Sequence, residues 1–404
     1  MKAFNLKKNA FYILVLISMF PLLPKAAESI LMILFFLVSL IVFFKNKNYC
    51  NKVTLLQVLT LSSLFIIYLI SSLYSKNLLE AFNFILRVAP IFLFALTLGF
   101  LNPILTKKKK KFLLNIYVFS VFLALLIVHI YLSFNVSREI TSWEYRNAFE
   151  EYTKVHGTYF SLWTGFAVLI MLNKICNLKF NKINFRIILP YALVLFYCIY
   201  WQFIIAARLP LFVTLLLSFA LILKQFQKRI AFLIFFTAIT LALVIGVVNL
   251  NSIKNKIDFK IPQGKYEIKH DVMTSEDIRA GIYFCSYKII KQSILYGIGI
   301  GDVNDKLDKC YESEIDSDVY QIFHYNSHNQ YVQVILASGL LGLLFFLYNL
   351  FILLKLSIKK NDNLFFALNM FLIICFFTEN ILSRHDGVIF YSFFTTIFYF
   401  NKEV

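Results

Sequence analysis

Long apolar segments recur along almost the whole chain, and they constrain its fold more than any other feature. Each is about 20 residues long, the length at which a helix crosses roughly 30 Å of hydrocarbon. Strands of a membrane barrel would be about half as long and would alternate in polarity, which these segments do not. Hydrophobic residues make up 60% of the 404 residues, more than in a soluble domain. The sequence therefore predicts an all-α polytopic membrane protein.

The apolar segments predict about 12 membrane-spanning helices. The first, with lysines before it and KAAES after it, resembles a signal peptide, and we favour a retained helix. The expected helices cover residues 10–23, 27–44, 53–73, 80–101, 112–134, 158–173, 187–205, 209–223, 230–250, 329–354, 364–383 and 387–400. The chain then divides into residues 1–250 with helices 1–9 and a smaller outer loop at 135–157, a large outer loop at 251–328, and residues 329–404 with helices 10–12.

The net charge of +18 comes mainly from short loops. Basic residues gather at the N-terminus and in alternate connections, in KNKNYCNK, TKKKKK, KICNLKFNKINFR, KQFQKR and KLSIKK. The positive-inside rule makes this side cytoplasmic, so both termini are expected inside and the large loop outside, in the periplasm. Because topology explains the charge, we expect no nucleic-acid partner for the lysine run at 107–111.

Two cysteines, Cys285 and Cys310, share the large outer loop. In an oxidising exterior they could form a disulfide, and unpaired thiols are an equal alternative. The chain has no C-x-x-C or H-E-x-x-H spacing, so no metal site is expected.

The middle of the large loop, TSEDIRAGIYFCSYKIIKQSILYGIGIGD, predicts a helix that begins after Thr274. Arg279 and Tyr283 lie four residues apart on one face of it, with Ser286 and Tyr287 a turn further on. A guanidinium there suits a diphosphate, because its planar fork binds two oxygens and stays charged; an ordinary solvated arginine is the alternative. The glycines of the following GIGIG are expected to form a tight turn rather than a dinucleotide site.

The stretch HYNSHNQYVQVILASGLLGLLFFL places His328 and Asn329 where an apolar helix begins. On a continuous helix, His328 shares a stripe with Val332, Ile335, Gly339 and Gly342, and the glycines let a neighbouring helix approach closely. A neutral imidazole at this rim could accept a proton from an attacking hydroxyl. An interfacial histidine that only bridges water and protein is the alternative.

Three further charges interrupt apolar surroundings. Arg208 lies in the short outer turn AARLPLF, where either an anionic substrate or lipid headgroups could be its partner. Arg87 and Glu379 are expected within helices, in the outer half of the bilayer, where they could pair with each other. We rank Arg87 and Glu379 below Arg208 and Arg279 as site candidates.

Several of these motifs together resemble the bacterial O-antigen ligase family. The resemblance lies in AARLPLF, in RAGIYFCSYKIIKQSILYGIGIGD and in SHNQYVQVILASGLLGLLFFL, with VHGTYFSLW and TENILSRHDGVIFYSFF as flanking segments. It covers the chain from about residue 150 onward. It implies an inverting glycosyltransferase of the bacterial inner membrane that uses neither metal, cofactor nor nucleotide sugar. The donor would be a glycan on undecaprenyl diphosphate and the acceptor a hydroxyl of lipid A-core, or of another glycan, at the periplasmic face.

The resemblance also implies residue roles. Arg208 and Arg279 would hold the diphosphate, and His328 would activate the acceptor hydroxyl. Asn329 and Tyr283 lie beside these residues and are expected substrate contacts. His324 would replace His328 as the base if the helix began sooner, and His156 would line the acceptor entrance.

The sequence is also compatible with three other functions. An O-antigen polymerase would join repeat units with the same donor, and a protein O-oligosaccharyltransferase would use a serine or threonine acceptor. A transporter of the lipid-linked glycan would carry charged or interrupted helices near the bilayer midplane and internal repeats, and no repeat is evident in the sequence.

Overall fold

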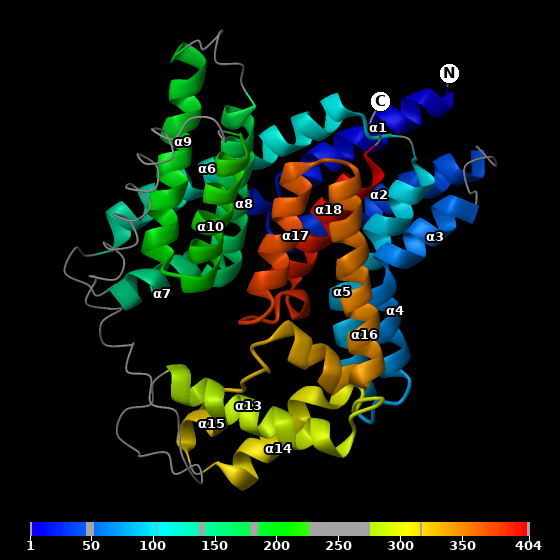
Figure 1. Ribbon diagram of the computed structural model, residues 1–404, viewed down its shortest axis with the longest axis vertical. Helices are drawn as coiled ribbons and strands as arrows, with labels where there is room; N and C mark the ends of the chain where they lie inside the picture. The colour runs from blue at the N-terminus through cyan, green and yellow to red at the C-terminus, as the bar shows by residue number, and fades with distance from the viewer. Residues whose placement is uncertain are drawn as a thin grey trace.

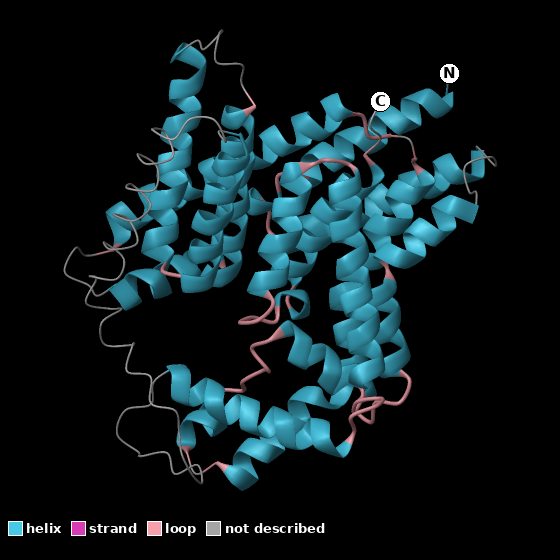
Figure 2. Ribbon diagram, in the orientation of Figure 1, coloured by secondary structure: helices cyan, strands magenta, loops and turns pink. Residues whose placement is uncertain are grey.

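All secondary structure in the described part of the chain is helical, which confirms the predicted all-α class (Figure 2). The computed structural model describes residues 2–45, 52–102, 104–136, 142–177, 185–225, 275–315 and 317–401. The helices are α1 Lys2–Ile17, η1 Phe20–Leu22, α2 Lys25–Lys45, α3 Lys52–Leu61, α4 Ser63–Ser72, α5 Leu78–Phe100, α6 Lys107–Asn135, α7 Ser142–Thr153, α8 Gly157–Cys176, α9 Phe185–Ile205, α10 Arg208–Gln225, α13 Ser275–Gln292, η3 Ile300–Asp302, α14 Val303–Glu314, α15 Asp318–Ile322, α16 Gln330–Lys359, α17 Asn363–Cys375, η4 Ile381–Ser383 and α18 His385–Phe400.

Five of these helices, α2, α5, α6, α8 and α16, are long and apolar enough to cross a membrane. A sixth candidate is the pair α3 and α4, which bends by 65° within the predicted helix 53–73. Two shorter helices, α9 and α17, are also apolar. Large apolar side chains such as Ile33 and Phe44 of α2 are exposed, as expected for contact with lipid rather than water. A multi-pass membrane protein is supported, although the described residues do not reproduce the predicted count of about 12 spans.

One predicted helix is longer than the helix in the structure, and another predicted segment lies outside the described residues. The predicted helix 364–383 ends at Cys375, so residues 376–384 form a connection that contains only the short η4. The predicted helix 230–250, the first part of the large outer loop at 251–274 and its expected cap Thr274 lie outside the described residues.

The outer layer, residues 275–322, lies at the end of the molecule opposite both chain termini (Figure 1). Within it α13 packs against α14, and α14 against α15. A disulfide joins Cys285 of α13 to Cys310 of α14, which resolves the alternative that the sequence left open. Cross-linking this loop restricts the unfolded chain and typically stabilises a fold by about 3 kcal/mol.

The outer layer is attached to the membrane helices through the turn before α5. Both carboxylate oxygens of Asp302 accept backbone N–H groups, from Lys76 and from Asn77, each at 2.8 Å. The hydroxyl of Ser75 accepts the N–H of Gly301 at 3.0 Å. These bonds fix the start of α14 against the start of α5.

A break in α16 forms the second attachment. Gly339 has φ 67° and ψ −168°, so the helix is interrupted there rather than continuous. The segment 294–299 docks on the break: Ile298 N–H donates to the carbonyl of Leu336 at 2.8 Å, and Leu340 N–H donates to the carbonyl of Ile294 at 2.8 Å. The backbone groups freed by the break are thereby satisfied, as a membrane protein requires.

Because of this break, the prediction that one continuous stripe runs along α16 is wrong. Gly339 does permit close approach, but its neighbour is the backbone of segment 294–299 and not a membrane helix. Gly342 lies close to Ile67 of α4, so the predicted approach of a neighbouring helix is confirmed at that glycine. His328 precedes the helix, so it does not lie on a stripe with the residues after the break. The GIGIG segment forms the expected turn, with Gly297 and Gly299 in the left-handed region at φ 72° and 90°.

We expect Gly339→Ala to destabilise the protein. An added Cβ would overlap the backbone of Leu295 and Tyr296, and an alanine at positive φ is strained. The combined cost should be about 2 kcal/mol. Thermal unfolding of the purified protein in detergent should therefore show a lower midpoint than wild type. The exposed Leu341→Ala is the matched control, and equal midpoints for the two variants would contradict the account.

Candidate functional site

Two loops meet at the outer end of the membrane helices, and their contact defines the site. One is residues 326–329, just before α16, and the other is the connection 376–384. We call their contact the loop clasp. Its centre is Asn380, which is fully buried and accepts the backbone N–H of Asn329 at 2.7 Å. The amide of Asn380 also donates to Ser327 Oγ at 2.9 Å and to Gln333 Oε1 at 3.2 Å.

Asn329 explains why a polar pair stands at the start of an apolar helix. Its side-chain oxygen accepts the N–H groups of Tyr331 and Val332, so it is the N-cap of α16. Its side-chain nitrogen donates to the carbonyl of Phe377 at 3.0 Å, within the loop clasp. Asn329 therefore has a structural task beside the substrate contact that the sequence suggested.

His328 is held in an unusual backbone conformation by this arrangement. Its φ is 42°, a left-handed value that is strained for a residue with a side chain, and its N–H donates to Asn326 Oδ1 at 2.9 Å. Its Nδ1 lies 3.6 Å from Glu379 Oε2, too long for a hydrogen bond but within ion-pair distance. The side chain is 26% exposed, so the imidazole is half-buried beside a buried carboxylate.

Glu379 lies in the connection after α17, so the prediction that it lies within a helix is wrong. It does not pair with Arg87, whose guanidinium donates instead to the carbonyl of Ser383 at 3.4 Å. Burial alone would raise the pKa of Glu379, but His328, His156 and Arg384 together outweigh burial and lower its pKa. Glu379 is therefore a carboxylate at neutral pH, supported by positive or polarisable neighbours.

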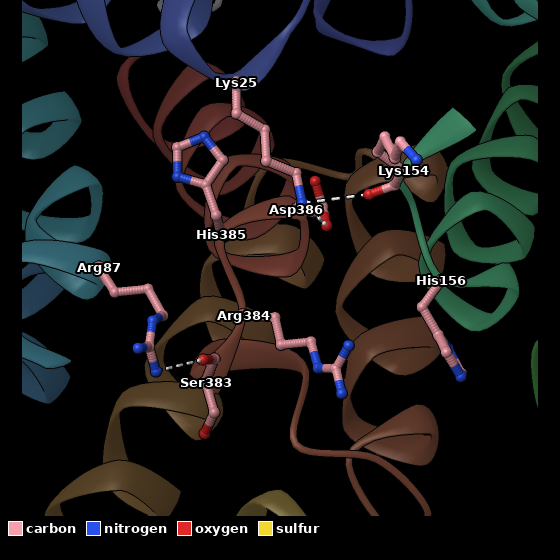
Figure 3. Close-up of a pocket in the computed structure, with 8 residues that line it drawn as sticks. All are labelled: Lys25, Arg87, Lys154, His156, Ser383, Arg384, His385 and Asp386. Atoms are coloured by element: carbon pink, nitrogen blue, oxygen red, sulfur yellow. Dashed lines mark hydrogen bonds and ion pairs between the residues drawn. The ribbon is translucent and has the colours of Figure 1, made fainter. Parts of the chain in front are cut away.

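A cationic cavity of about 330 Å³ lies beside this carboxylate (Figure 3). Four side chains that are positively charged at neutral pH line it, together with one carboxylate. Lys25 forms an ion pair with that carboxylate, Asp386, at 3.1 Å. In Figure 3 the guanidinium of Arg384 points to the side of the cavity where His156 lies. The lining residues are Lys25, Arg87, Lys154, His156, Ser383, Arg384, His385 and Asp386. Such a cavity attracts an anion.

His156, expected at the acceptor entrance, lines this cavity and is the N-cap of α8. Its Nδ1 accepts the N–H of Thr158 at 3.4 Å, and its Nε2 lies 4.0 Å from Glu150 Oε2. Burial is the largest cause that lowers the pKa of His156, and it outweighs the carboxylates of Glu150 and Glu379. His156 and His328 are thus both neighbours of the carboxylate of Glu379.

The two predicted arginines belong to different groups of helices. Arg208 is exposed at the first residue of α10, which packs against α8 and α17. Arg279 is half-buried in α13, which packs against α14 within the outer layer and against the membrane helix α16. Tyr283 is partly exposed one turn after Arg279, as expected. Ser286, expected near the same face, is instead buried and donates to the carbonyl of Ile282.

His324 lies apart from the loop clasp. Its side chain is 79% exposed, and its Nδ1 lies 2.9 Å from Asp308 Oδ2 in α14. Since α16 begins after Asn329, the helix does not start soon enough to put His324 in the place of His328.

Sequence reasoning did not single out Arg384, His385 or Asp386. A signal was present, because SRHD interrupts two apolar segments near the C-terminus. Such a charged run inside a membrane protein marks a functional site by default.

We expect acidification to destabilise the protein partly through His156. Its folded pKa lies below the ordinary value of 6.5, so the unfolded chain binds the proton more strongly as the pH falls through that value. His156→Asn keeps an N-cap and removes the titration. Between about pH 7.5 and about pH 5.5, the unfolding midpoint of this variant should fall less than that of wild type. An equal fall in both proteins would count against the assignment.

Comparison with protein families places this geometry in context. A family model described as O-antigen ligase matches residues 190–347, from α9 through the outer layer and into α16. A search of curated proteins found no match. The match supports glycosyltransferase activity of the O-antigen ligase or polymerase kind in a multi-pass membrane protein. It confirms the resemblance to the O-antigen ligase family that the motifs indicated, over residues 190–347.

Proposed function

We propose that this protein transfers a glycan from undecaprenyl diphosphate to an acceptor hydroxyl, with lipid A-core as the acceptor. The observation that carries the proposal is the half-buried pair of His328 and Glu379 beside a cationic cavity. A base next to a site for a charged leaving group is the arrangement that glycosyl transfer from a lipid diphosphate needs.

In the proposed step the acceptor oxygen attacks C1 of the donor sugar and gives its proton to His328. Because Nδ1 faces Glu379, the free ring nitrogen Nε2 is the acceptor of that proton. The bond between C1 and the diphosphate oxygen breaks, and its electron pair leaves with undecaprenyl diphosphate. Attack from the opposite face inverts the configuration at C1. The carboxylate of Glu379 stabilises the imidazolium that forms.

We further propose that the cationic cavity holds the diphosphate of the donor. Negative charge grows on the leaving group as the bond to C1 breaks, and permanent cations placed there lower the barrier. Arg384 is suited to this task because its exposed guanidinium lines the cavity, where it also lies close enough to Glu379 to help lower the pKa of that carboxyl. Arg208 and Arg279 are proposed as further contacts of the same donor, from α10 and α13 respectively.

The proposed setting rests on the topology that the positive-inside rule predicts. With both termini in the cytoplasm, the outer layer and the loop clasp face the periplasm of a bacterial inner membrane. We propose this orientation because the outer layer lies at the end opposite both termini (Figure 1). The polymerase reaction shares the donor and the proposed step, and differs only in using a second lipid-linked glycan as the acceptor.

We expect His328→Ala to lower the turnover number by about a hundredfold or more, since it removes general-base catalysis. Glu379→Gln should lower it by about tenfold, since the imidazolium loses its counter-charge. Both are measured with purified protein in lipid nanodiscs, a lipid-diphosphate-linked glycan and an acceptor lipid. Turnover by His328→Ala at the wild-type rate would remove His328 from catalysis.

The same assay separates the roles of the arginines. Arg384→Ala, Arg279→Ala and Arg208→Ala should each raise KM for the donor and leave KM for the acceptor unchanged. Lys291→Ala is the matched control, because Lys291 is an exposed cation of α13 outside the cavity. An arginine whose removal leaves the donor KM at its wild-type value does not hold the diphosphate.

A further inference from the structure

A second cavity, of about 300 Å³, lies where the outer layer meets the start of α5. Its walls come from α14, from the turn before α5 and from the chain just ahead of His328. The residues that matter for its chemistry are Asn77, Asn304, Asp305, Asp308, Tyr325 and Asn326. Neither lysine nor arginine lines it, in contrast to the cationic cavity.

The negative charge of this second cavity disfavours the anionic diphosphate that we propose for the first cavity. Its carboxylates, which include Glu80, would repel a diphosphate or an acidic sugar. In the part of the chain that the structure describes, no group of three or more His, Cys, Asp or Glu side chains is arranged to hold a metal ion. Among the groups that a glycan substrate presents, this lining therefore fits an uncharged sugar rich in hydroxyl groups better than an anionic one.

The lining groups match the chemistry of such a ligand. Carboxylate and amide oxygens accept hydrogen bonds from hydroxyl groups, and amide nitrogens donate to them. Internal bonds orient several of these groups in advance: Asn77 Nδ2 donates to Asp305 Oδ2 at 2.9 Å, and His324 binds Asp308 at the same distance. Asn304 lines the cavity, its side chain is exposed, and that side chain forms no hydrogen bond with any described residue, so its amide is available to a ligand.

The cavity is joined directly to the proposed catalytic histidine. The ring of Tyr325, which lines the cavity, lies 6.2 Å from the ring of His328, centroid to centroid. Asn326, also in the lining, accepts the backbone N–H of His328 at 2.9 Å. A ligand in this cavity would therefore lie against the turn that carries His328.

We propose that this cavity is a subsite for an uncharged sugar residue of a substrate. The inference rests on the proposed function and adds a substrate class to the same site. His328 then lies between an anion site on the Glu379 side and a sugar site on the Tyr325 side. The sugar belongs either to the acceptor or to the donor glycan, because both present the same hydroxyl chemistry.

The first test measures binding without turnover. Full-length protein in lipid nanodiscs is mixed with glucose, galactose, N-acetylglucosamine or glucuronate, and contact is read by saturation-transfer NMR. We expect contact with at least one neutral sugar, weaker contact with glucuronate, and about tenfold weaker binding of the neutral sugar to Asn304→Ala. Lys309→Ala, an exposed change in the same helix, should bind as wild type. Absence of contact with all neutral sugars, or equal binding by Asn304→Ala, overturns the proposal.

This binding test also separates the subsite from the proposed function. His328→Ala should bind the neutral sugar as wild type does, even where it transfers no glycan. A wild-type protein that binds the sugar but transfers nothing would reject the proposed function and keep the subsite.

The second test identifies the source of the sugar in the transfer assay. Asn304→Ala should raise KM about tenfold for one substrate, with the turnover number changed less than twofold. A rise for the acceptor assigns the cavity to the acceptor, and a rise for the donor assigns it to the donor glycan. Unchanged KM values for both substrates would overturn the proposal.

Discussion

The buried hydrogen-bond network of the loop clasp is the interaction on which the rest of the site depends. Asn380, Ser327 and Gln333 are almost wholly inaccessible, and each satisfies the others. A buried polar group without a partner costs about 1–3 kcal/mol, so the loss of one member penalises those that remain. The network fixes the start of α16 against the connection after α17. His328 and Glu379 come from these two loops, and their approach follows from it.

A second network extends the same contact into the membrane helices. Gln330 is fully buried, donates to the hydroxyl of Tyr68 at 2.9 Å and accepts the N–H of Leu382 at 2.7 Å. The break at Gly339 then fastens the first part of α16 to the outer layer through backbone bonds. The Asn380 network, the hydrogen bonds of Gln330 and the backbone bonds at the Gly339 break therefore all stabilise the structure around the strained turn at His328. Strained backbone persists at a functional site only where the surrounding structure fixes it in this way. On the proposed function, the rigid turn separates an anion site from a sugar site.

The sequence predicted what local patterns determine. The length of the apolar segments predicted the helical class, the segment TSEDIRAGIYFC predicted a helix where α13 lies, and a histidine beside asparagine marked the start of α16. Hydropathy could not show that α16 breaks at Gly339, because the break is stabilised by backbone bonds to a segment about 40 residues earlier in the chain. Nor could it pair Glu379 with His328, or gather Lys25, Arg87 and Arg384 around one cavity, because such contacts depend on tertiary packing. Two cysteines in one loop permitted a disulfide, and only the packing of α13 on α14 decided it.

The most direct test of the account is the glycan profile of cells that lack this protein and carry either the wild-type or the His328→Ala gene. Surface glycans and glycans linked to undecaprenyl diphosphate are resolved by size. We expect wild type to restore long chains on lipid A-core, whereas His328→Ala should leave them on the lipid carrier. Single repeats on lipid A-core, with long chains missing, would instead indicate a polymerase. Full restoration by His328→Ala would contradict the claim that the pair of His328 and Glu379 is the centre of glycan transfer.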